Sequence, residues 1–320
     1  MLTSKRISIV PIAYKDEGNI EELYKRVTNV MRQVSRNYEI IYVNDASPDR
    51  SQAILRKIAN RDKKLTVILH SRNFGAQNAF TSGMKQANGD AVIIMDGDLQ
   101  DPPELIPEFV RKWLDGFDVV YGARKKREKS MGPVMEFIYH SFYILFNKLS
   151  YIKVPLDAGD FSLMDRRVVN YINDLPENDR FIRGLRAWVG FKQVGVDYIR
   201  PERFSGSGIS TNSILKGIMW ARKAIFSFSY APLEWVFYAA IVSVFVALLA
   251  AVLYIILYFY IPESPRGFIT ILISVLFLGS IQLTVLSIVS EYIRRIFEEV
   301  KHRPSAIIEE IINNHTGNRI

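Results

Sequence analysis

The sequence contains no cysteine and only four histidines in 320 residues. Without cysteine, disulfide scaffolds, thiolate zinc sites, iron–sulfur clusters and cysteine nucleophiles are excluded. The histidines are scattered, and no two have the spacing of metal ligands. No Walker A loop, no G-x-G-x-x-G after the first strand pattern and no G-x-S-x-G elbow is present. These absences argue against P-loop NTPases, Rossmann dinucleotide enzymes and α/β-hydrolases.

Charge is moderate in amount but uneven in distribution. Charged residues make up 23% and hydrophobic residues 49%, which excludes wholesale disorder. The formal net charge of +8 fits nucleic acid, anionic lipid or phosphorylated substrates. The basic residues gather beside two apolar runs and not on an aromatic-lined face, so we expect no nucleic-acid partner.

Two long runs, Val236 to Ile261 and Gly267 to Ser290, carry no charge at all. Each exceeds the roughly 20 residues that a helix needs to cross a bilayer. We therefore expect transmembrane helices at about 235–261 and 267–290, in a hairpin spanning 233–290. The alternative, a pair of buried core helices, is rare at this length without a charge.

Basic residues flank the hairpin on both sides, and the positive-inside rule then predicts that both flanks are cytoplasmic. The expected protein is an integral membrane protein with two spans, whose catalytic domain and both termini lie in the cytoplasm. Residues Met1 to Arg6 lead directly into a strand pattern, which predicts no signal peptide. The flanking residues are Lys216, Arg222 and Lys223 before the first span, and Arg294, Arg295, Lys301 and Arg303 after the second.

Two further stretches, near 134–149 and at 212–229, mix aromatic and aliphatic residues with a few charges. We expect amphipathic helices in the membrane interface there, while packing on the sheet or on another subunit is the alternative. The expected organisation is a domain at 1–211 that includes the helix near 134–149, the interfacial helix 212–229, the hairpin and a C-terminal tail at 291–320.

Short apolar runs alternate with helical patterns over the first 125 or so residues. Such alternation predicts an α/β fold with a mostly parallel sheet covered on both faces. Ligands bind such sheets at the carboxyl ends of the strands. The expected strands are 7–11, 39–43, 65–69, 91–95 and 119–121, and the expected helices are 20–34, 51–59, 76–87 and 103–114.

Three of the loops that follow these strands carry carboxylates, and the sharpest pattern is Asp96-Gly97-Asp98. Two aspartates leaving a buried strand place hard oxygen ligands near one point, which suits Mg²⁺ or Mn²⁺ holding a diphosphate. Plainer interpretations remain open. Asp45 and Asp101 could cap the helices that follow them, and His70 at a strand end could be structural.

Several ordered motifs resemble family 2 glycosyltransferases of the GT-A fold, in particular the polyisoprenyl-phosphate glycosyltransferases. That group includes the bactoprenol glucosyltransferases and dolichyl-phosphate mannose synthase. The resemblance runs from Val10 to about Pro304 and includes VPIAYKDEGNI, IIYVNDASPDRS, IIMDGDLQDPPE, DAGDFSLMDRRV and EYIRRIFEEVKHRP. It implies a GT-A Rossmann-like sheet followed by interfacial helices and the transmembrane hairpin.

The resemblance also implies a role for individual residues. Those implied to bind the nucleotide sugar are Pro11, Tyr14, Glu17, Asp45 and Asp96. Those implied to hold the metal are Asp96, Asp98 and Gln100, while Asp98 and Asp157 are the implied catalytic residues. Arg124, Arg200 and Arg203 are expected at the lipid phosphate.

The chain departs from the family pattern at three places, and one of them is Ser162, where an arginine is common. Lys15-Asp16 replaces the usual Asn-Glu, which leaves Glu17 as the expected contact. The residues after Arg203 lack the lysine expected near the phosphate. The assignment of the acceptor site is therefore the least constrained.

The resemblance implies inverting transfer of a sugar, first of all glucose from UDP-glucose, onto undecaprenyl or another polyprenyl phosphate at the cytoplasmic face of a bacterial inner membrane. GDP-mannose is the second donor considered. A homo-oligomer, dimer or tetramer, is also expected. Alternatives are a glycolipid synthase, a processive polysaccharide synthase, or a non-catalytic nucleotide-binding scaffold. Processive relatives carry a Q-x-x-R-W motif, where this chain has Gly184-Leu-Arg186-Ala-Trp188.

Overall fold

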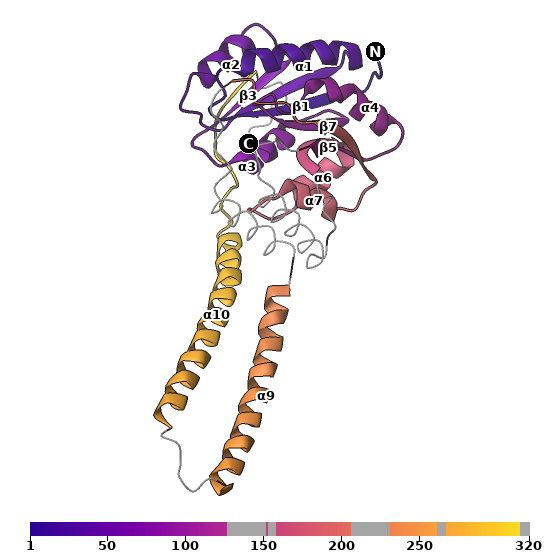
Figure 1. Ribbon diagram of the computed structural model, residues 1–320. Helices are drawn as coiled ribbons and strands as arrows, with labels where there is room; N and C mark the ends of the chain where they lie inside the picture. The colour runs from indigo at the N-terminus through magenta and orange to yellow at the C-terminus, as the bar shows by residue number, and fades with distance from the viewer. Residues whose placement is uncertain (127–151, 153–157, 206–228, 230, 261–266, 314–320) are drawn as a thin grey trace. The chain divides into compact units, whose positions relative to one another are not determined.

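The computed structural model describes residues 1–126, 152, 158–205, 229, 231–260 and 267–313. The chain forms two compact units (Figure 1). The first comprises Met1–Asn147, Ile152–Ala221 and Pro304–Ile320, and the second comprises Lys148–Tyr151 and Arg222–Arg303. The chain therefore enters the second unit twice and each time returns to the first.

An eight-stranded sheet forms the centre of the first unit, with strand order β7-β5-β6-β4-β1-β2-β3-β8. The pairs β1/β2, β1/β4, β2/β3 and β5/β7 are parallel, whereas β4/β6, β5/β6 and β3/β8 are antiparallel. The expected mostly parallel sheet is confirmed. The strands are β1 (Ile7–Ala13), β2 (Tyr38–Asn44), β3 (Leu65–His70), β4 (Ala91–Asp96), β5 (Val119–Lys126), β6 (Ala158–Asp165), β7 (Gln193–Ile199) and β8 (Ile308–Ile312).

Helices cover both faces of this sheet (Figure 1). On one face lie α1 (Ile20–Val34), α2 (Ser51–Ala59), the 3₁₀ turn η1 (Pro103–Leu105) and α4 (Ile106–Leu114). On the other lie α3 (Ala76–Gln86), α6 (Arg166–Asp174) and α7 (Ile182–Trp188).

The apolar periodicity of the sequence explains how these helices pack. α1 buries Leu23, Val27 and Met31, which follow one another at the four-residue spacing of one helix face. α3 approaches the sheet so closely that a Cβ at Gly83 would lie 2.2 Å from Val10 Cγ1. Buried β-branched residues fill the core between the layers.

β6 was not among the strands expected from the sequence, which included none at 158–165. Asp160 belongs to β6, which pairs antiparallel with β4 on one side and β5 on the other. Phe161 and Leu163 of this strand enter the hydrophobic core, and Ser162 is buried as well. The small and polar residues of this segment concealed the strand, because its stability comes from neighbours on both sides.

The second unit contains two long helices, α9 (Ala231–Tyr260) and α10 (Phe268–Val300). Within them, Ala231–Ala250 (20 residues) and Ser274–Val300 (27 residues) are long and apolar enough to cross a membrane. Large apolar side chains on these helices are exposed, such as Phe245 with 71% of its surface accessible. The expected interfacial helices, near 134–149 and at 212–229, lie outside the described residues apart from Ser229.

α10 continues beyond the expected end at Ser290 to Val300. Ion pairs one turn apart, Glu291 with Arg294 and Glu298 with Lys301, accompany this extension. Such pairs stabilise a polar helical segment. The residues expected as a tail at 291–320 thus include the end of α10 and the edge strand β8.

Candidate active site

Three loops meet at the carboxyl ends of β1, β2 and β4. Each contains a residue other than glycine in the left-handed region: Lys15 (φ 61°), Ala46 (φ 51°) and Leu99 (φ 63°). Such conformations cost free energy and persist where the surrounding structure enforces them, commonly at functional sites. The backbone conformation therefore indicates a candidate functional site at this edge of the sheet.

The end of β4 carries the two aspartates of the Asp96-Gly97-Asp98 triplet. A Cβ at Gly97 would lie 2.1 Å from the carbonyl oxygen of Ile12, so only glycine allows β4 to leave the sheet so close to β1. Asp98 Oδ1 accepts a hydrogen bond from the backbone N–H of Gln100 (3.0 Å). The glycine thus fixes where the two carboxylates stand.

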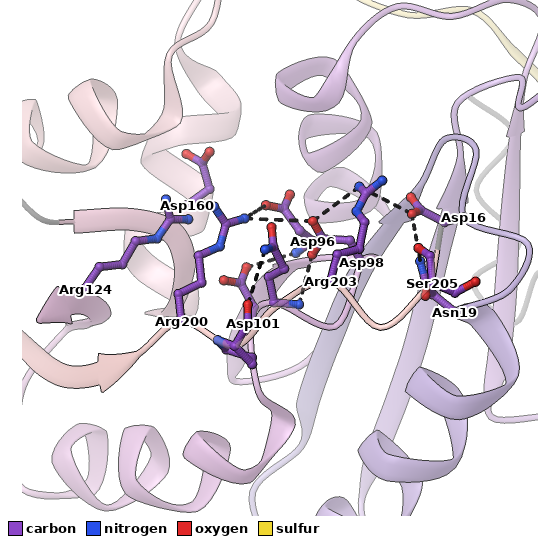
Figure 2. Close-up of polar contacts among 12 residues, drawn as sticks. Asp16, Asn19, Asp96, Asp98, Asp101, Arg124, Asp160, Arg200, Arg203 and Ser205 are labelled. Carbon is purple, nitrogen blue, oxygen red and sulfur yellow. Dashed lines mark hydrogen bonds and ion pairs between the residues drawn. The ribbon is translucent and has the colours of Figure 1, made fainter. Parts of the chain in front are cut away.

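Two arginines from the segment after β7 face these carboxylates (Figure 2). The Arg203 guanidinium lies 3.3 Å from Asp98 Oδ2, and the Arg200 guanidinium lies 3.9 Å from both Asp96 Oδ2 and Asp98 Oδ2. The Gln100 side chain donates to the Pro201 carbonyl (3.2 Å), which holds the same segment in place. Predicted metal residues and predicted phosphate residues therefore meet at one point.

Asp16 is a site residue that the motif comparison missed. It is 7% exposed, and its Oδ1 lies 3.6 Å from the Arg203 guanidinium that also contacts Asp98. Burial raises the pKa of Asp16 above its ordinary value. Glu17, which we expected to bind the nucleotide, pairs with Arg50 (3.3 Å), and its role stays a prediction. The two neighbouring carboxylates thus face different ways.

Asp101 is fully buried and does not cap a helix. It accepts hydrogen bonds from the backbone N–H of Asp96 (3.2 Å) and from the Tyr198 hydroxyl (2.9 Å). Arg124 in turn donates to the Tyr198 hydroxyl (3.3 Å). Burial, together with Asp101 and Asp98, raises the pKa of Asp96 well above its ordinary value. Crowded carboxylates of this kind favour the approach of a cation.

A second group of acidic and basic residues surrounds the start of β6, and no sequence pattern predicted its basic members. Arg183 forms two parallel hydrogen bonds to Asp160, of 2.9 and 2.8 Å. Burial raises the pKa of Asp160, but the Arg183 charge outweighs it, so the pKa lies below its ordinary value. Arg186 is 1% exposed, and burial lowers its pKa to about 10.

Asp45 is the most completely engaged of the predicted nucleotide residues. Its carboxylate accepts hydrogen bonds from the backbone N–H groups of Phe74 and Gly75, both 2.8 Å long. It also contacts His70 Nδ1 (2.8 Å), whose Nε2 lies 2.9 Å from Ser82 Oγ. Because a carboxylate only accepts, Nδ1 carries the proton. Asp45 therefore shapes the loop before α3 and does not cap α2.

The structure describes some of the remaining predicted site residues and leaves others outside the described ranges. Pro11 is buried in β1 opposite Met95 of β4, and Tyr14 is half-buried in the loop that follows β1. Asp157 lies outside the described residues, directly before Ala158 at the start of β6. Among the described residues, no three acidic or histidine side chains converge on a common point. The acidic ligands predicted here are two carboxylates, supplemented by the Gln100 amide.

Comparison with known proteins agrees with this geometry. Residues 8–172, just over half of the chain, match the family model described as glycosyl transferase family 2. The "Uncharacterized glycosyltransferase YkcC" of Bacillus subtilis is 39% identical, covering 95% of this chain and 93% of the relative. The "SfII prophage-derived bactoprenol glucosyl transferase" of Shigella flexneri is 37% identical, covering 98% and 99%.

Among solved structures, the mannosyltransferase PcManGT from Pyrobaculum calidifontis is similar to this chain. It has 15% identity and a TM-score of 0.44, and the match covers 90% of this chain and 87% of that one. The family match and the near full-length relatives confirm the family that the motifs indicated. The chain belongs to glycosyl transferase family 2.

Proposed function

We propose that this glycosyltransferase moves a sugar from a nucleotide diphosphate to a polyprenyl monophosphate. The observation that supports it most is the meeting of Asp96 and Asp98 with Arg200 and Arg203 at the carboxyl edge of the sheet. Two anionic substrates that must react need cations to bring them together. The similarity to a bactoprenol glucosyl transferase over nearly the whole chain supports the polyprenyl acceptor.

A divalent cation, Mg²⁺ or Mn²⁺, fits the residues present. Mg²⁺ is usually held by one or two carboxylates together with substrate phosphates, which matches the donor set Asp96, Asp98 and the Gln100 amide. The raised pKa of Asp96 reflects partly the repulsion by Asp98 and Asp101, which a cation would relieve. Bound there, the metal would offset negative charge on the leaving diphosphate.

We expect the arginines at this edge of the sheet to bind the phosphate of the acceptor. When the donor binds, we expect Arg200 and Arg203 to give up their contacts with the aspartates and to hold phosphate oxygens. Arg124, placed by Tyr198, would contribute a third positive charge. The acceptor phosphate is already anionic near neutral pH, so it attacks the anomeric carbon with inversion and needs no strong base. Asp157 would orient it or stabilise positive charge on the sugar.

Membrane attachment fits a lipid acceptor. We propose that α9 and α10 cross the membrane as a hairpin, that 134–149 and 212–229 lie in the interface, and that the catalytic unit and both termini are cytoplasmic. Held at the bilayer, the enzyme would meet its acceptor at high effective concentration. UDP-glucose is the proposed donor, and a dimer or tetramer the proposed assembly.

A transfer assay tests the reaction. The full chain, purified in detergent, receives undecaprenyl phosphate, Mn²⁺ or Mg²⁺, and one labelled UDP- or GDP-sugar at a time. We expect metal-dependent label in the lipid phase from UDP-glucose. Asp98→Asn should abolish it, whereas the control Glu104→Gln, which removes a surface partner of Arg26, should not.

The other outcomes are equally informative. Label from GDP-mannose alone would keep the reaction and correct the donor. Label on a diacyl lipid or in a growing polymer would replace the acceptor. Nucleotide binding without transfer to any acceptor would favour a scaffold and contradict the proposal.

A further inference from the structure

A cleft of about 630 Å³ opens at the opposite edge of the sheet, where the parallel strands begin. It lies between the end of α1, the start of β2 and the turn between α2 and β3. This volume is within the range of small-molecule sites. The residues that line it are Tyr24, Thr28, Arg32, Arg36, Tyr38, Arg61, Asp62 and Lys64.

The lining carries four cationic side chains and a single carboxylate, which already has partners. Asp62 Oδ2 accepts a hydrogen bond from the Tyr24 hydroxyl (2.5 Å), and Oδ1 accepts one from the backbone N–H of Lys64 (2.9 Å). Lys64 Nζ donates to the Arg36 carbonyl (2.9 Å) and lies 3.9 Å from the centre of the Tyr38 ring. The lysine and the aspartate therefore form the frame of the cleft.

The three arginines of the cleft have no such partners. Within the described residues, the guanidinium groups of Arg32, Arg36 and Arg61 make no hydrogen bond or ion pair. Two other arginines, within the helices that end beside the cleft, do: Arg26 of α1 pairs with Glu104, and Arg56 of α2 pairs with Glu310. Among the described residues, carboxylates therefore pair with these two arginines but not with the three that line the cleft.

The dipoles of the neighbouring helices offset only part of this positive charge. α1 and α2 both end beside the cleft, and a helix C-terminus carries about half a negative charge. Two such ends and Asp62 offset about two of the four cations. An excess of about two positive charges therefore faces the cleft, with guanidinium groups that can each hold a phosphate by two parallel hydrogen bonds.

We propose that this cleft binds a small molecule carrying several phosphate groups, at a site separate from the one that transfers the sugar. β2 separates the two sites: Tyr38 begins it in the cleft, and Asn44 ends it beside Asp45. The proposal does not depend on the acceptor or the donor of the transfer reaction, because none of the cleft residues belongs to the carboxyl edge.

Calorimetric titration with inorganic tripolyphosphate tests this site. The full chain in detergent is titrated in EDTA, without divalent metal, so that the acidic carboxyl edge does not attract the anion. We expect saturable binding whose affinity falls as salt rises. Arg61→Ala and Arg32→Ala should each weaken it about tenfold or more, the effect of losing a charged hydrogen bond. Arg61→Lys should recover part of the loss.

Two matched controls locate the binding. Arg111→Ala removes another exposed arginine in the last turn of a helix, α4, and should leave the affinity within about twofold. Arg203→Ala removes a cation of the carboxyl edge and should also leave it unchanged. An equal loss in Arg111→Ala, a loss confined to Arg203→Ala, or no saturable binding would each overturn the proposal.

Discussion

The two edges of the sheet handle charge in opposite ways. At the carboxyl edge, Asp96, Asp98 and Asp16 are buried or half-buried, and Arg200 and Arg203 lie close enough to offset them. At the opposite edge, Arg32 and Arg61 are exposed and have no carboxylate partner among the described residues. The first edge contains matched charges, which the proposed substrates would rearrange, whereas the described part of the second edge has an unmatched excess of positive charge.

This difference separates two ways of binding phosphate. A site with internal ion pairs binds its ligand only when new contacts replace old ones, which gives selectivity at the expense of affinity. A site with free guanidinium groups binds any suitable polyanion, and salt weakens it directly.

The largest effect is expected from Asp98→Asn at the carboxyl edge. The substitution removes the charge that holds the proposed metal and leaves Arg203 with Asp16 as its partner. Metal-assisted stabilisation amounts to several kcal/mol, so we expect transfer to fall at least about 100-fold. Initial rates of lipid labelling measure this. A rate within about threefold of the wild type would contradict the role of Asp98.

The next effect concerns stability. Asp160→Asn removes the buried carboxylate that faces the Arg183 and Arg186 charges. Breaking a buried pair in this way costs about 3 kcal/mol or more. We expect the melting temperature of the catalytic unit to fall by about 6–12 °C. Thermal unfolding followed by circular dichroism measures it, and a change below about 2 °C would show that the pair is not needed.

The same pair predicts a pH dependence. The pKa of Asp160 is lowered in the folded protein, because the Arg183 charge outweighs burial. Its stabilisation is therefore present above the ordinary aspartate pKa and is lost as the pH falls towards the folded-state pKa. The difference in melting temperature between wild type and Asp160→Asn should shrink on acidification. A difference that grows would contradict this assignment.

A smaller effect is expected at His70, which positions Asp45 and hence the loop at Phe74 and Gly75. His70→Asn keeps a donor where Nδ1 stands, whereas His70→Gln keeps one only where Nε2 stands. We expect His70→Gln to raise the KM for the nucleotide sugar several-fold with little change in kcat, and His70→Asn to raise it less. Steady-state kinetics distinguish them. Equal KM values would leave His70 with a packing role alone.

The smallest effect is expected where β8 meets α2. Arg56 and Glu310 form a paired contact in which both side chains are about 40% exposed. Exposed ion pairs contribute less than about 1 kcal/mol. Arg56→Ala should therefore lower the melting temperature by no more than about 4 °C and leave tripolyphosphate binding in the cleft unchanged. If Arg56→Ala lost tripolyphosphate binding, the binding would depend on any positive charge on α2 and not on the cleft residues.

The sequence predicted the parts of the fold that have local patterns. Ile20–Val34 and Ser51–Ala59 form helices as expected, because apolar residues recur there at helical spacing. β1 to β5 follow from short runs of buried aliphatic residues. β8 did not follow, since Ile308–Ile312 pairs with a strand that is far away in the sequence and has no pattern of its own.

The residues of the candidate site also fall into those that local patterns predicted and those that they did not. Asp96 and Asp98 could be placed because they directly follow a strand, and strand ends converge at one edge. His70 and Arg183 could not, since their partners Asp45 and Asp160 lie in other elements. The contact between Glu17 and Arg50 could not be predicted either, because the two residues lie in different loops. Contacts between elements set these details, and no local spacing records them.

The most direct test of the contrast is a paired binding measurement on two variants. UDP-glucose with Mn²⁺, and tripolyphosphate in EDTA, are each titrated into Asp98→Asn and Arg61→Ala. The account predicts that Asp98→Asn loses only the nucleotide sugar and that Arg61→Ala loses only tripolyphosphate. Loss of both ligands in either variant, with the fold intact, would contradict two separate phosphate sites at the two edges of the sheet.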